Sequence, residues 1–319
     1  MLANQLEWLF SLPPILHRLP CIAASALLKY TFGMATYVKP WADIFIRYLF
    51  GRQANEKLLL SFTNAVLEDS GIPTIVALEI KNPFNLADEM LAKESILDIK
   101  ATDEHGAIYD IEVQTGGEPL FSNRSLYYWA KNYGSQMDKG EQYDQLKPVI
   151  CINILNFVLI KELPAMHTCF MLLEKDNPEF ALTRHCMLHF LELPKINKKN
   201  NFTNNLERWL TFLKAEGQEE ETMKVIMDDD AIFVKAHEEY TTFTRDDRMR
   251  EIYEAREKAL KDYNSGISYG QKLGIEQGIE KASKDNAQRM LEEKMSIDTI
   301  ARCTGLTREQ IEALRNTKD

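Results

Sequence analysis

Asp98, Glu112 and Gln114 have the side chains and the spacing that a divalent-metal site requires. Carboxylate oxygens are the ligands that hard cations such as Mg²⁺ prefer, and a neighbouring amide can orient a water molecule. Two carboxylates side by side repel each other, so a fold that brings Asp98 and Glu112 together asks for a compensating cation. A bound divalent ion can activate water and neutralise the oxygens of a phosphate group. The chemistry that these residues suggest is metal-assisted hydrolysis.

Residues 95–103 and 107–114 are predicted to form the β-hairpin that positions these side chains. Polar and apolar residues alternate along both segments, as they do along half-buried strands. The corner ends at Gly106, and a three-residue hairpin loop usually ends in a left-handed residue, which glycine adopts without steric cost. Pairing across this corner places Asp98 opposite Glu112. One face then carries Ile96, Asp98, Lys100, Asp110, Glu112 and Gln114, and the core face carries Leu97, Ile99, Tyr109, Ile111 and Val113.

The composition is typical of a soluble globular protein and argues against several function classes. Of the 319 residues, 45% are hydrophobic and 27% are charged. The five cysteines are never spaced as Cys-x-x-Cys, which argues against a zinc site or a disulfide framework and favours the reducing cytoplasm. With a net charge of -10 and no obvious phosphate-binding patch, affinity for DNA should depend on the metal ion and be salt-sensitive. No phosphate-binding Gly-x-x-x-x-Gly-Lys motif is present, so no nucleotide cofactor is expected.

An Asp on one strand and Glu-x-Gln on the next resemble the PD-(D/E)xK nuclease superfamily, and more closely its recombination-promoting nuclease (Rpn) family of transposase-like proteins. The last motif position is a lysine in the wider superfamily and a glutamine in the Rpn branch, where Gln114 stands here. Further resemblance is found upstream, in residues 39–47 and 55–67. Downstream it continues in Arg124, 127–129 and 140–149, so that the match covers about residues 37–193.

The resemblance implies an α/β fold with a PD-(D/E)xK restriction-endonuclease-like core, of element order αβββαβ around a mixed sheet, and a C-terminal helical extension. It also implies a Mg²⁺-dependent DNA endonuclease that hydrolyses phosphodiester bonds in recombination or transposition-like events, with Mn²⁺ or another divalent ion as an alternative. A second hypothesis stays open: a catalytically inactive protein that keeps the nuclease fold for DNA binding or self-assembly. Gln114 is compatible with this inactive form, because an amide is neither a cation nor a proton acceptor.

The needs of phosphodiester hydrolysis suggest a role for each motif residue. Asp98 and Glu112 are predicted to bind the metal ion, with the backbone carbonyl of Val113 as a third ligand, and Gln114 to orient the attacking water. Alternation alone would also fit an ordinary exposed strand face. The opposing Asp98 and the upstream motif favour the metal site.

Other residues are predicted to surround this centre. Asp43, from the first helix, is a candidate catalytic carboxylate, with Glu56 as its competitor and a helix cap as an alternative role. From the helix after the hairpin, Arg124 and Lys131 are predicted to contact phosphate, with Tyr128 packing beside them.

Periodicity predicts the elements that carry these residues. Helices are expected over residues 40–51, from a cap at Asn55 to a break at 71–73, and from a cap at Ser122 to about residue 137. Strands are expected over residues 74–80, 149–155, 168–173 and 186–193. A further helix is predicted from the apolar stripe of Leu206, Trp209, Leu210 and Leu213.

The chain is divided into five parts on this basis. Residues 37–200 are the nuclease-like domain, 201–262 an acidic helical extension, 263–284 a glycine-periodic helix or linker, and 285–319 a small helix-turn-helix-like tail. Residues 1–36 form an apolar, proline-interrupted extension with no run of the roughly 18 apolar residues that a membrane span needs. The extension is predicted to be dispensable, with a short membrane-associating helix as the alternative.

The C-terminal parts leave two questions open. A glycine at every fourth residue makes a face that another backbone could approach, so a homo-oligomer through this helix and a flexible linker both fit; the glycines are Gly266, Gly270, Gly274 and Gly278. In the tail, Thr307 and Gln310 are predicted to form a capping box. Glu309 and Glu312 favour a structural or oligomerising hairpin over one that reads bases.

Two further polar groups are predicted to be structural. His185 and His189 are expected to be satisfied core or surface histidines rather than metal ligands. The acidic run 228–230 is expected to be a solvated face or a helix N-terminus.

Overall fold

The computed structural model describes residues 37–85, 98–117, 120–138, 140, 142–196, 202–215, 220–228 and 230–316. The chain divides into two units, Met1–Tyr253 and Glu254–Asp319, and each is considered by itself. The predictions made for residues 1–36 and for the first hairpin residues, 95–97, lie outside the described part of the chain.

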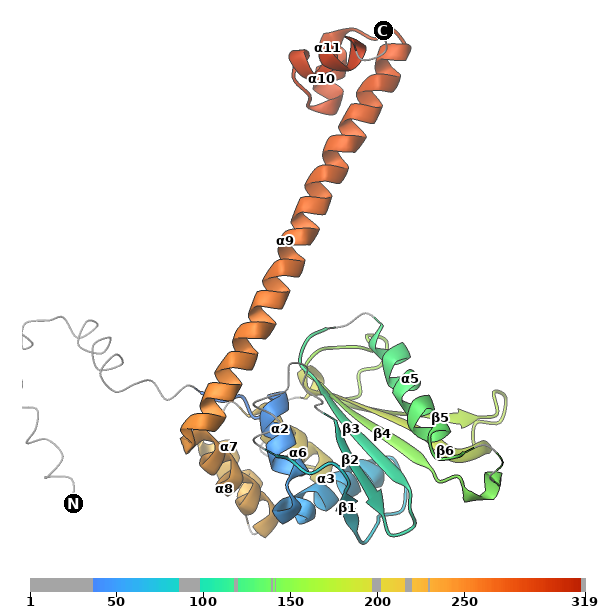
Figure 1. Cartoon of the computed structure of the whole chain (residues 1–319), viewed down its shortest axis with the longest axis vertical. Helices are drawn as coiled ribbons and strands as arrows, with labels where there is room; N and C mark the ends of the chain where they lie inside the picture. The colour runs from blue at the N-terminus through green and yellow to red at the C-terminus, as the bar shows by residue number, and fades with distance from the viewer. Residues whose placement is uncertain are drawn as a thin grey trace, which may run out of the picture. The chain divides into compact units, whose positions relative to one another are not determined.

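A six-stranded mixed sheet forms the centre of the first unit (Figure 1). Its strands lie in the order β1 (Leu78–Ile80), β2 (Ile99–Asp103), β3 (Ile108–Gln114), β4 (Val149–Leu155), β6 (Ala181–Glu192) and β5 (His167–Leu173). The strands β3, β4 and β6 run parallel to one another, and the other neighbours pair antiparallel. This mixed sheet and its helices confirm the predicted fold class.

Helices cover both faces of this sheet (Figure 1). One face packs against α2 (Asp43–Gly51), α3 (Glu56–Asp69) and α6 (Asn205–Lys214), and the other against α5 (Phe121–Gly134). The alternation along β4 separates the two cores: Ile152 joins the first, and Cys151 joins the second. We call the two sides the α3 face and the α5 face.

The helical segment that follows the sheet shares the core of the α3 face. Trp209 of α6 lies with its ring centroid 5.4 Å from that of Phe50 and 6.0 Å from that of Phe62. The predicted apolar stripe is confirmed, because all its members are buried: Leu206, Trp209, Leu210 and Leu213. Burying one such side chain contributes about 1.5–3 kcal/mol relative to its exposure. Further helices follow in α7 (Glu220–Met227) and α8 (Ala231–Arg245), which packs against α2 and α3.

The hairpin forms in the predicted register. Ile99 pairs with Ile111, and the N–H group of Asp103 donates a hydrogen bond of 3.1 Å to the carbonyl of Ala107. Gly106 closes the corner with a φ of 84°, in the left-handed region that glycine occupies without a steric penalty. The turn residues and the period-two pattern were therefore sufficient to fix which residues face each other.

Several predicted boundaries and caps are wrong. The strand expected over 74–80 is limited to β1, because the N–H groups of Val76 and Ala77 donate to the carboxylate of Glu104 instead of to a strand. The helix expected from residue 40 begins at Asp43, and the helix expected after Ser122 is α5, which has Leu120 at its N-cap and ends at Gly134. Strand β6 begins at Ala181 rather than at 186.

Three capping predictions have separate outcomes. Asn55 precedes α3, but its side-chain oxygen accepts no capping hydrogen bond from the described residues; its Nδ2 donates to the carbonyl of Leu49 over 3.0 Å. Within the acidic run, Asp230 is the N-cap of α8 and accepts from the N–H of Ile232, which confirms the predicted helix N-terminus. Ser122 is not the N-cap of α5, because this helix begins one residue earlier, at Phe121.

The second unit holds α9 (Asp247–Glu292) from Glu254 onwards, together with α10 (Ile297–Thr304) and α11 (Arg308–Asn316). The predicted capping box is confirmed: the N–H of Thr307 donates to Oε1 of Gln310 over 2.8 Å, and the N–H of Gln310 donates to Oγ1 of Thr307 over 3.3 Å. Gly305 ends α10 in the left-handed region, with a φ of 72°. The helices enclose a small core of Ala287, Ile300, Leu306 and Ile311.

The glycine-periodic segment is part of α9. Among the described residues, a Cβ atom placed on any of its four glycines would have no atom within 4 Å apart from the nearby backbone of its own helix. Large apolar side chains are exposed along the same stretch: Tyr263, Ile267, Tyr269, Leu273, Ile275 and Ile279. Within the described residues, no helix combines the length and the apolar character that crossing a membrane requires.

Candidate active site

The carboxylates lie together on the α5 face of β2 and β3. Lys100 pairs with Asp110 across the two strands. Continuing the same register past Ile99 places Asp98 level with Glu112, as the sequence predicted. Side chains from α5 close this face, because Asn132 contacts Asp110 and Arg124 approaches Glu112.

Asp110 is the most buried carboxylate of the group. Only 3% of the residue is exposed. Its Oδ2 accepts a hydrogen bond of 2.5 Å from Nδ2 of Asn132, whereas its Oδ1 is buried and has no hydrogen-bond partner among the described residues. Leaving a buried polar atom unpaired costs about 1–3 kcal/mol, and more for a charged one. Such an atom therefore marks a place where a ligand would be stabilising.

Glu112 shows the same feature two residues further along β3. Its side chain is 15% exposed, and its Oε2 is buried without a hydrogen-bond partner in the described part of the chain. The Nη2 of Arg124 lies 3.9 Å from this oxygen, which is too far for a hydrogen bond. Two unsatisfied carboxylate oxygens thus share one face of a single strand.

Burial and mutual repulsion raise the pKa of both carboxyl groups. For Asp110, burial and then the charge of Asp98 raise the pKa to about 6. For Glu112, burial and then the charge of Asp110 raise the pKa to about 7. The charges of Lys100 and Arg124 act in the opposite direction, but they do not cancel the effect. A cation bound between the carboxylates would remove the cost of ionising them.

The donor set fits a hard divalent ion that keeps part of its water shell. In the described ranges, no group of three or more His, Cys, Asp or Glu residues is placed so that it could hold a metal ion through protein ligands. Mg²⁺ is usually held by one or two carboxylates, with waters and substrate phosphate completing the shell. The unpaired oxygens of Asp110 and Glu112, beside Asp98, match that requirement.

Gln114 lies on the same strand face, beyond Glu112. Its Nε2 donates a hydrogen bond of 3.3 Å to the carbonyl of Gly116. The side-chain NH₂ group is therefore engaged by the loop after β3, and its Oε1 remains an acceptor.

The structure brings one of the predicted α5 residues to the carboxylates. Arg124 approaches Glu112, and its guanidinium carbon lies 5.6 Å from the ring centroids of both Phe121 and Tyr128, which fits the predicted packing of Tyr128 beside it. Lys131 is exposed on the same helix, and its contact with phosphate stays a prediction.

Asp43 and Glu56 each stand at the start of a helix. Oδ1 of Asp43 accepts a hydrogen bond of 2.6 Å from the N–H of Ile44 at the beginning of α2. Oε1 of Glu56 accepts a hydrogen bond of 2.8 Å from Nε2 of Gln53. Both positions suit a helix terminus, and a catalytic role for Asp43 stays a prediction.

Comparison with known families decides the classification. The model of the family "PD-(D/E)XK nuclease family transposase" matches residues 40–270. The chain belongs to this family. A second match, to the "Rpn/YhgA-like nuclease family, C-terminal HTH domain", covers residues 281–316. Searches of curated proteins and of solved structures found no match.

Membership of the PD-(D/E)XK family confirms the resemblance and the fold inferred from the sequence. The C-terminal match covers the end of α9 together with α10 and α11, so this segment is similar to the C-terminal helix-turn-helix domain of the Rpn/YhgA-like nucleases. The hypothesis that this tail is structural rather than base-reading stays a prediction.

Sequence reasoning gave no role to three residues of the site of this PD-(D/E)XK protein. Asp110 and Lys100 were placed on the correct strand face, and their position beside the predicted ligands was the signal that could have singled them out. Asn132 carried no signal, because its contacts with Asp110 and with Lys100 (3.3 Å from Nζ to Oδ1) depend on how α5 is rotated against the sheet.

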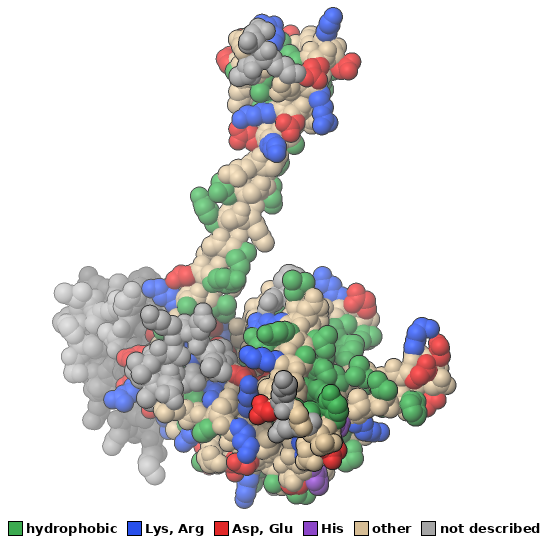
Figure 2. All heavy atoms as spheres, turned by 45° about the vertical axis from the view of Figure 1, so that its right-hand side comes forward, with side chains coloured by type: hydrophobic (Ala, Val, Ile, Leu, Met, Phe, Trp, Pro, Cys, Tyr) green, Lys and Arg blue, Asp and Glu red, His purple; other side chains and the backbone are tan. Residues whose placement is uncertain are grey.

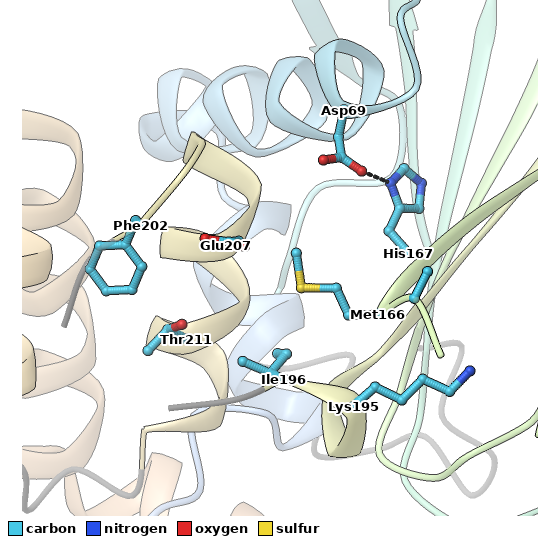
Figure 3. Close-up of a pocket in the computed structure, with 9 residues that line it drawn as sticks. Asp69, Met166, His167, Lys195, Ile196, Phe202, Glu207 and Thr211 are labelled. Carbon is cyan, nitrogen blue, oxygen red and sulfur yellow. Dashed lines mark hydrogen bonds and ion pairs between the residues drawn. The ribbon is translucent and has the colours of Figure 1, made fainter. Parts of the chain in front are cut away.

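A second polar cluster lies on the α3 face, beside a pocket of about 270 Å³ (Figure 3). Asp69 accepts a hydrogen bond of 2.6 Å from Nδ1 of His167, whose Nε2 lies 3.0 Å from Nδ1 of His189. Burial lowers the pKa of His189 to about 3, so its imidazole is neutral. These hydrogen bonds confirm that His189 is a satisfied core histidine. His185 likewise has a partner in the hydroxyl of Tyr133, 3.0 Å from its Nδ1.

Proposed function

We propose that this member of the PD-(D/E)XK nuclease family is a metal-dependent DNA endonuclease whose metal site is formed around Asp98 and Glu112. One observation carries the proposal: two buried carboxylate oxygens, on Asp110 and Glu112, have no hydrogen-bond partner in the described residues, at the face where Arg124 approaches. Family membership supports a nuclease, and the C-terminal helix-turn-helix domain supports DNA as the partner. A cytoplasmic role in recombination or transposition-like events belongs to the same proposal.

Asp98 and Glu112 would hold Mg²⁺, or Mn²⁺ in its place, with the carbonyl of Val113 as a further ligand. When bound, the ion supplies an activated water and neutralises the oxygens of the phosphate. Asp110 adds negative charge beside these ligands, with its Oδ1 open to the ion or to one of its waters, and Asn132 fixes its orientation through the bond to Oδ2. An anionic cluster of this kind binds a cation before it can approach the phosphate backbone of DNA.

The remaining groups of the chain position the substrate and the water. Arg124 would contact a phosphate oxygen while the rings of Phe121 and Tyr128 support its guanidinium. Gln114 would accept a hydrogen bond from the attacking water through Oε1, since its NH₂ group is bound to Gly116. The water oxygen then bonds to phosphorus while one bridging P–O bond breaks. Water releases a proton to solvent, and the leaving oxygen takes one up.

Nicking of supercoiled plasmid tests this proposal. We expect the purified chain to nick plasmid with Mg²⁺ or Mn²⁺ and not with EDTA, and we expect Asp98→Ala and Glu112→Gln to abolish the activity. The matched control is Glu276→Gln, which removes one exposed carboxylate from α9. Folded wild-type protein that shows no metal-dependent nicking at low salt would contradict the proposal. If nicking persists in both active-site variants, the catalytic residues lie at another site.

A second candidate is a non-catalytic protein that keeps the fold for binding or self-assembly. Two observations favour it. The motif position that is a lysine in the wider superfamily is Gln114, and hydrophobic side chains gather on one face of the sheet unit (Figure 2). Leu126 and Tyr127 of α5 are among the exposed large hydrophobic residues. Exposed apolar groups that lie together often mark an interaction surface. Metal binding that Glu112→Gln removes, without any nicking by the wild type, would favour this candidate.

Self-association through the glycine face of α9 is part of the second candidate. Side chains at positions 270 and 274 have open space around them, because a Cβ atom there would have no described atom within 4 Å apart from the nearby backbone of its own helix. The double variant Gly270→Leu, Gly274→Leu should therefore stay folded but lose close packing against a second copy. Sedimentation velocity would show a dimer for the wild type and a monomer for the variant. An unchanged sedimentation coefficient in the variant would show that this face does not mediate self-association.

A further inference from the structure

A lysine stands beside the carboxylates at a position that the nuclease motif does not assign. The motif residue on β3 is Gln114, which carries no charge. On β2, Lys100 pairs with Asp110, so that it shares the α5 face with the candidate metal ligands. Along this face the Asp98–Glu112 level lies in the middle, with Gln114 towards one end and Lys100 towards the other. The face therefore has a cation on the opposite side of the acidic pair from Gln114.

We infer that Lys100 is a catalytic residue that binds a non-bridging oxygen of the scissile phosphate and supplies the positive charge that Gln114 lacks. The inference rests on the proposed endonuclease function. It adds a residue, on another strand, to the machinery that acts on the phosphate.

Two acceptors from different elements hold the ammonium group of Lys100 at the site. Its Nζ lies 3.5 Å from Oδ2 of Asp98 and 3.3 Å from Oδ1 of Asn132. An ammonium group has three N–H donors, so one remains for a substrate oxygen. The Lys100 side chain is 41% exposed, against 19% for Asp98, so a phosphate arriving from solvent can reach it.

The charge of Lys100 also acts on the buried carboxyl groups. It opposes the rise in the pKa of Asp110 and of Glu112. A lysine needed only for this purpose would be best placed in the interior, close to the unpaired oxygens. Lys100 is instead held at the exposed edge of the cluster. There its ammonium group can interact both with the carboxylates and with the phosphate of an incoming substrate.

The step assigned to Lys100 moves no proton. Its ammonium group stays protonated and donates a hydrogen bond to the non-bridging oxygen while water adds to phosphorus and the leaving oxygen departs. Negative charge gathers on the non-bridging oxygens as the new bond forms, and a fixed donor aimed at this charge stabilises the transition state. A hydrogen-bonded cation should therefore affect kcat more than KM.

Lysine variants of the full chain test the inference. Removing one such donor typically lowers kcat by about 100-fold, so we expect that loss for Lys100→Met in plasmid nicking with Mg²⁺. We expect partial retention for Lys100→Arg and at least a tenfold recovery when Gln114→Lys is added to Lys100→Met. The matched control is Lys235→Met: Lys235 is 48% exposed and contacts the buried Glu239 over 2.9 Å, on α8. It should leave kcat unchanged.

Calorimetric titration with Mn²⁺ separates a catalytic from a structural role. Lys100→Met should bind Mn²⁺ at least as tightly as the wild type, because the variant removes a competing positive charge. A loss of Mn²⁺ binding that parallels the loss of nicking would overturn the inference in favour of a structural role. Wild-type rates in Lys100→Met would overturn the inference alone, whereas an inactive, folded wild type would overturn the endonuclease proposal with it.

Discussion

The two faces of the same sheet carry polar clusters of opposite character. On the α3 face, Asp69, His167 and His189 satisfy one another: Asp69 receives hydrogen bonds from His167 and from Nδ2 of Asn204 over 2.6 Å each. These bonds keep the pKa of Asp69 below its usual value. On the α5 face, burial instead raises the pKa of Asp110, and its Oδ1 has no hydrogen-bond partner among the residues that the structure describes.

This difference indicates that the cluster on the α3 face stabilises the fold, whereas the cluster on the α5 face is suited to bind a ligand. Buried polar groups in proteins are normally hydrogen-bonded, so each exception needs an explanation. The histidine cluster needs none, although it lies beside a pocket and contains the residue types of a metal site (Figure 3). The carboxylate cluster lacks partners that a cation would supply. Buried polar atoms without hydrogen-bond partners therefore locate the candidate active site better than a cavity does.

The largest expected effect tests which cluster is catalytic. Glu112→Gln should lower metal-dependent nicking by at least about 1,000-fold, equivalent to about 4 kcal/mol of transition-state stabilisation. His189→Gln, on the α3 face, should leave the rate per folded molecule unchanged. Initial nicking rates, corrected for folded fraction by circular dichroism, make the comparison. Equal losses in the two variants would remove the distinction between the faces.

The second effect is a pH dependence of stability without metal. Burial raises the pKa of Glu112 from 4.5 to about 7 in the folded protein, so folding disfavours its ionised form. The resulting destabilisation is absent below pH 4.5, grows as the pH rises through this interval and is complete above about pH 7. Glu112→Gln should therefore raise the free energy of unfolding by about 3 kcal/mol at pH 8 and leave it unchanged near pH 4.

Urea unfolding in EDTA at both pH values measures this difference. The α3 face should respond in the opposite sense, because the pKa of Asp69 is lowered in the folded protein. Its contribution to stability is present above the ordinary aspartate pKa and is lost as the pH falls through the folded pKa. A Glu112→Gln variant that is less stable than the wild type at pH 8 would show that Glu112 already has a partner.

The third effect concerns the satisfied cluster. Asp69→Ala leaves the Nδ1 donor of His167 and the Nδ2 donor of Asn204 without their acceptor. The free energy of unfolding should fall by about 1–3 kcal/mol, while nicking per folded molecule stays at the wild-type level. Asp176→Ala, at a carboxylate that is 76% exposed, is the control and should change stability by less than about 0.5 kcal/mol. A loss of nicking without a loss of stability would give Asp69 a functional role.

The smallest effect compares two asparagines that play matched parts. Asn132 donates to Asp110 over 2.5 Å, and Asn204 donates to Asp69 over 2.6 Å. Asn132→Ala should lower nicking by about tenfold, or about 1.4 kcal/mol, because Asp110 loses the bond that orients it. Asn204→Ala should instead lower stability by about 1 kcal/mol, because Asn204 is also the N-cap of α6. A loss of nicking in Asn204→Ala, with only a loss of stability in Asn132→Ala, would contradict this assignment of the two asparagines.

Local patterns predicted the part of the site that one hairpin determines. Alternation and the turn at Gly106 were enough to place Asp98 opposite Glu112, because a strand pair with a fixed corner has one register. The length of β1 was not predictable in this way, since the Glu104 carboxylate takes the N–H groups of Val76 and Ala77. That contact joins residues far apart in the sequence.

The residues that complete each cluster come from separate elements. Asn132 reaches Asp110 from α5, and Asp69, His167 and His189 meet from α3, β5 and β6. Their meeting depends on how helices dock on the sheet, which periodicity does not specify. The side-chain partners, and hence the contrast between the two faces, could be recognised only in the folded structure.

Isothermal titration with Mn²⁺ at pH 8 tests the central claim most directly. The wild type and Asp69→Asn should each bind Mn²⁺ with the same affinity and stoichiometry, whereas the double variant Asp98→Asn, Glu112→Gln should show no binding heat at that site. This result would place the metal on the α5 face. Unchanged binding in the double variant, or loss of binding in Asp69→Asn alone, would contradict the account.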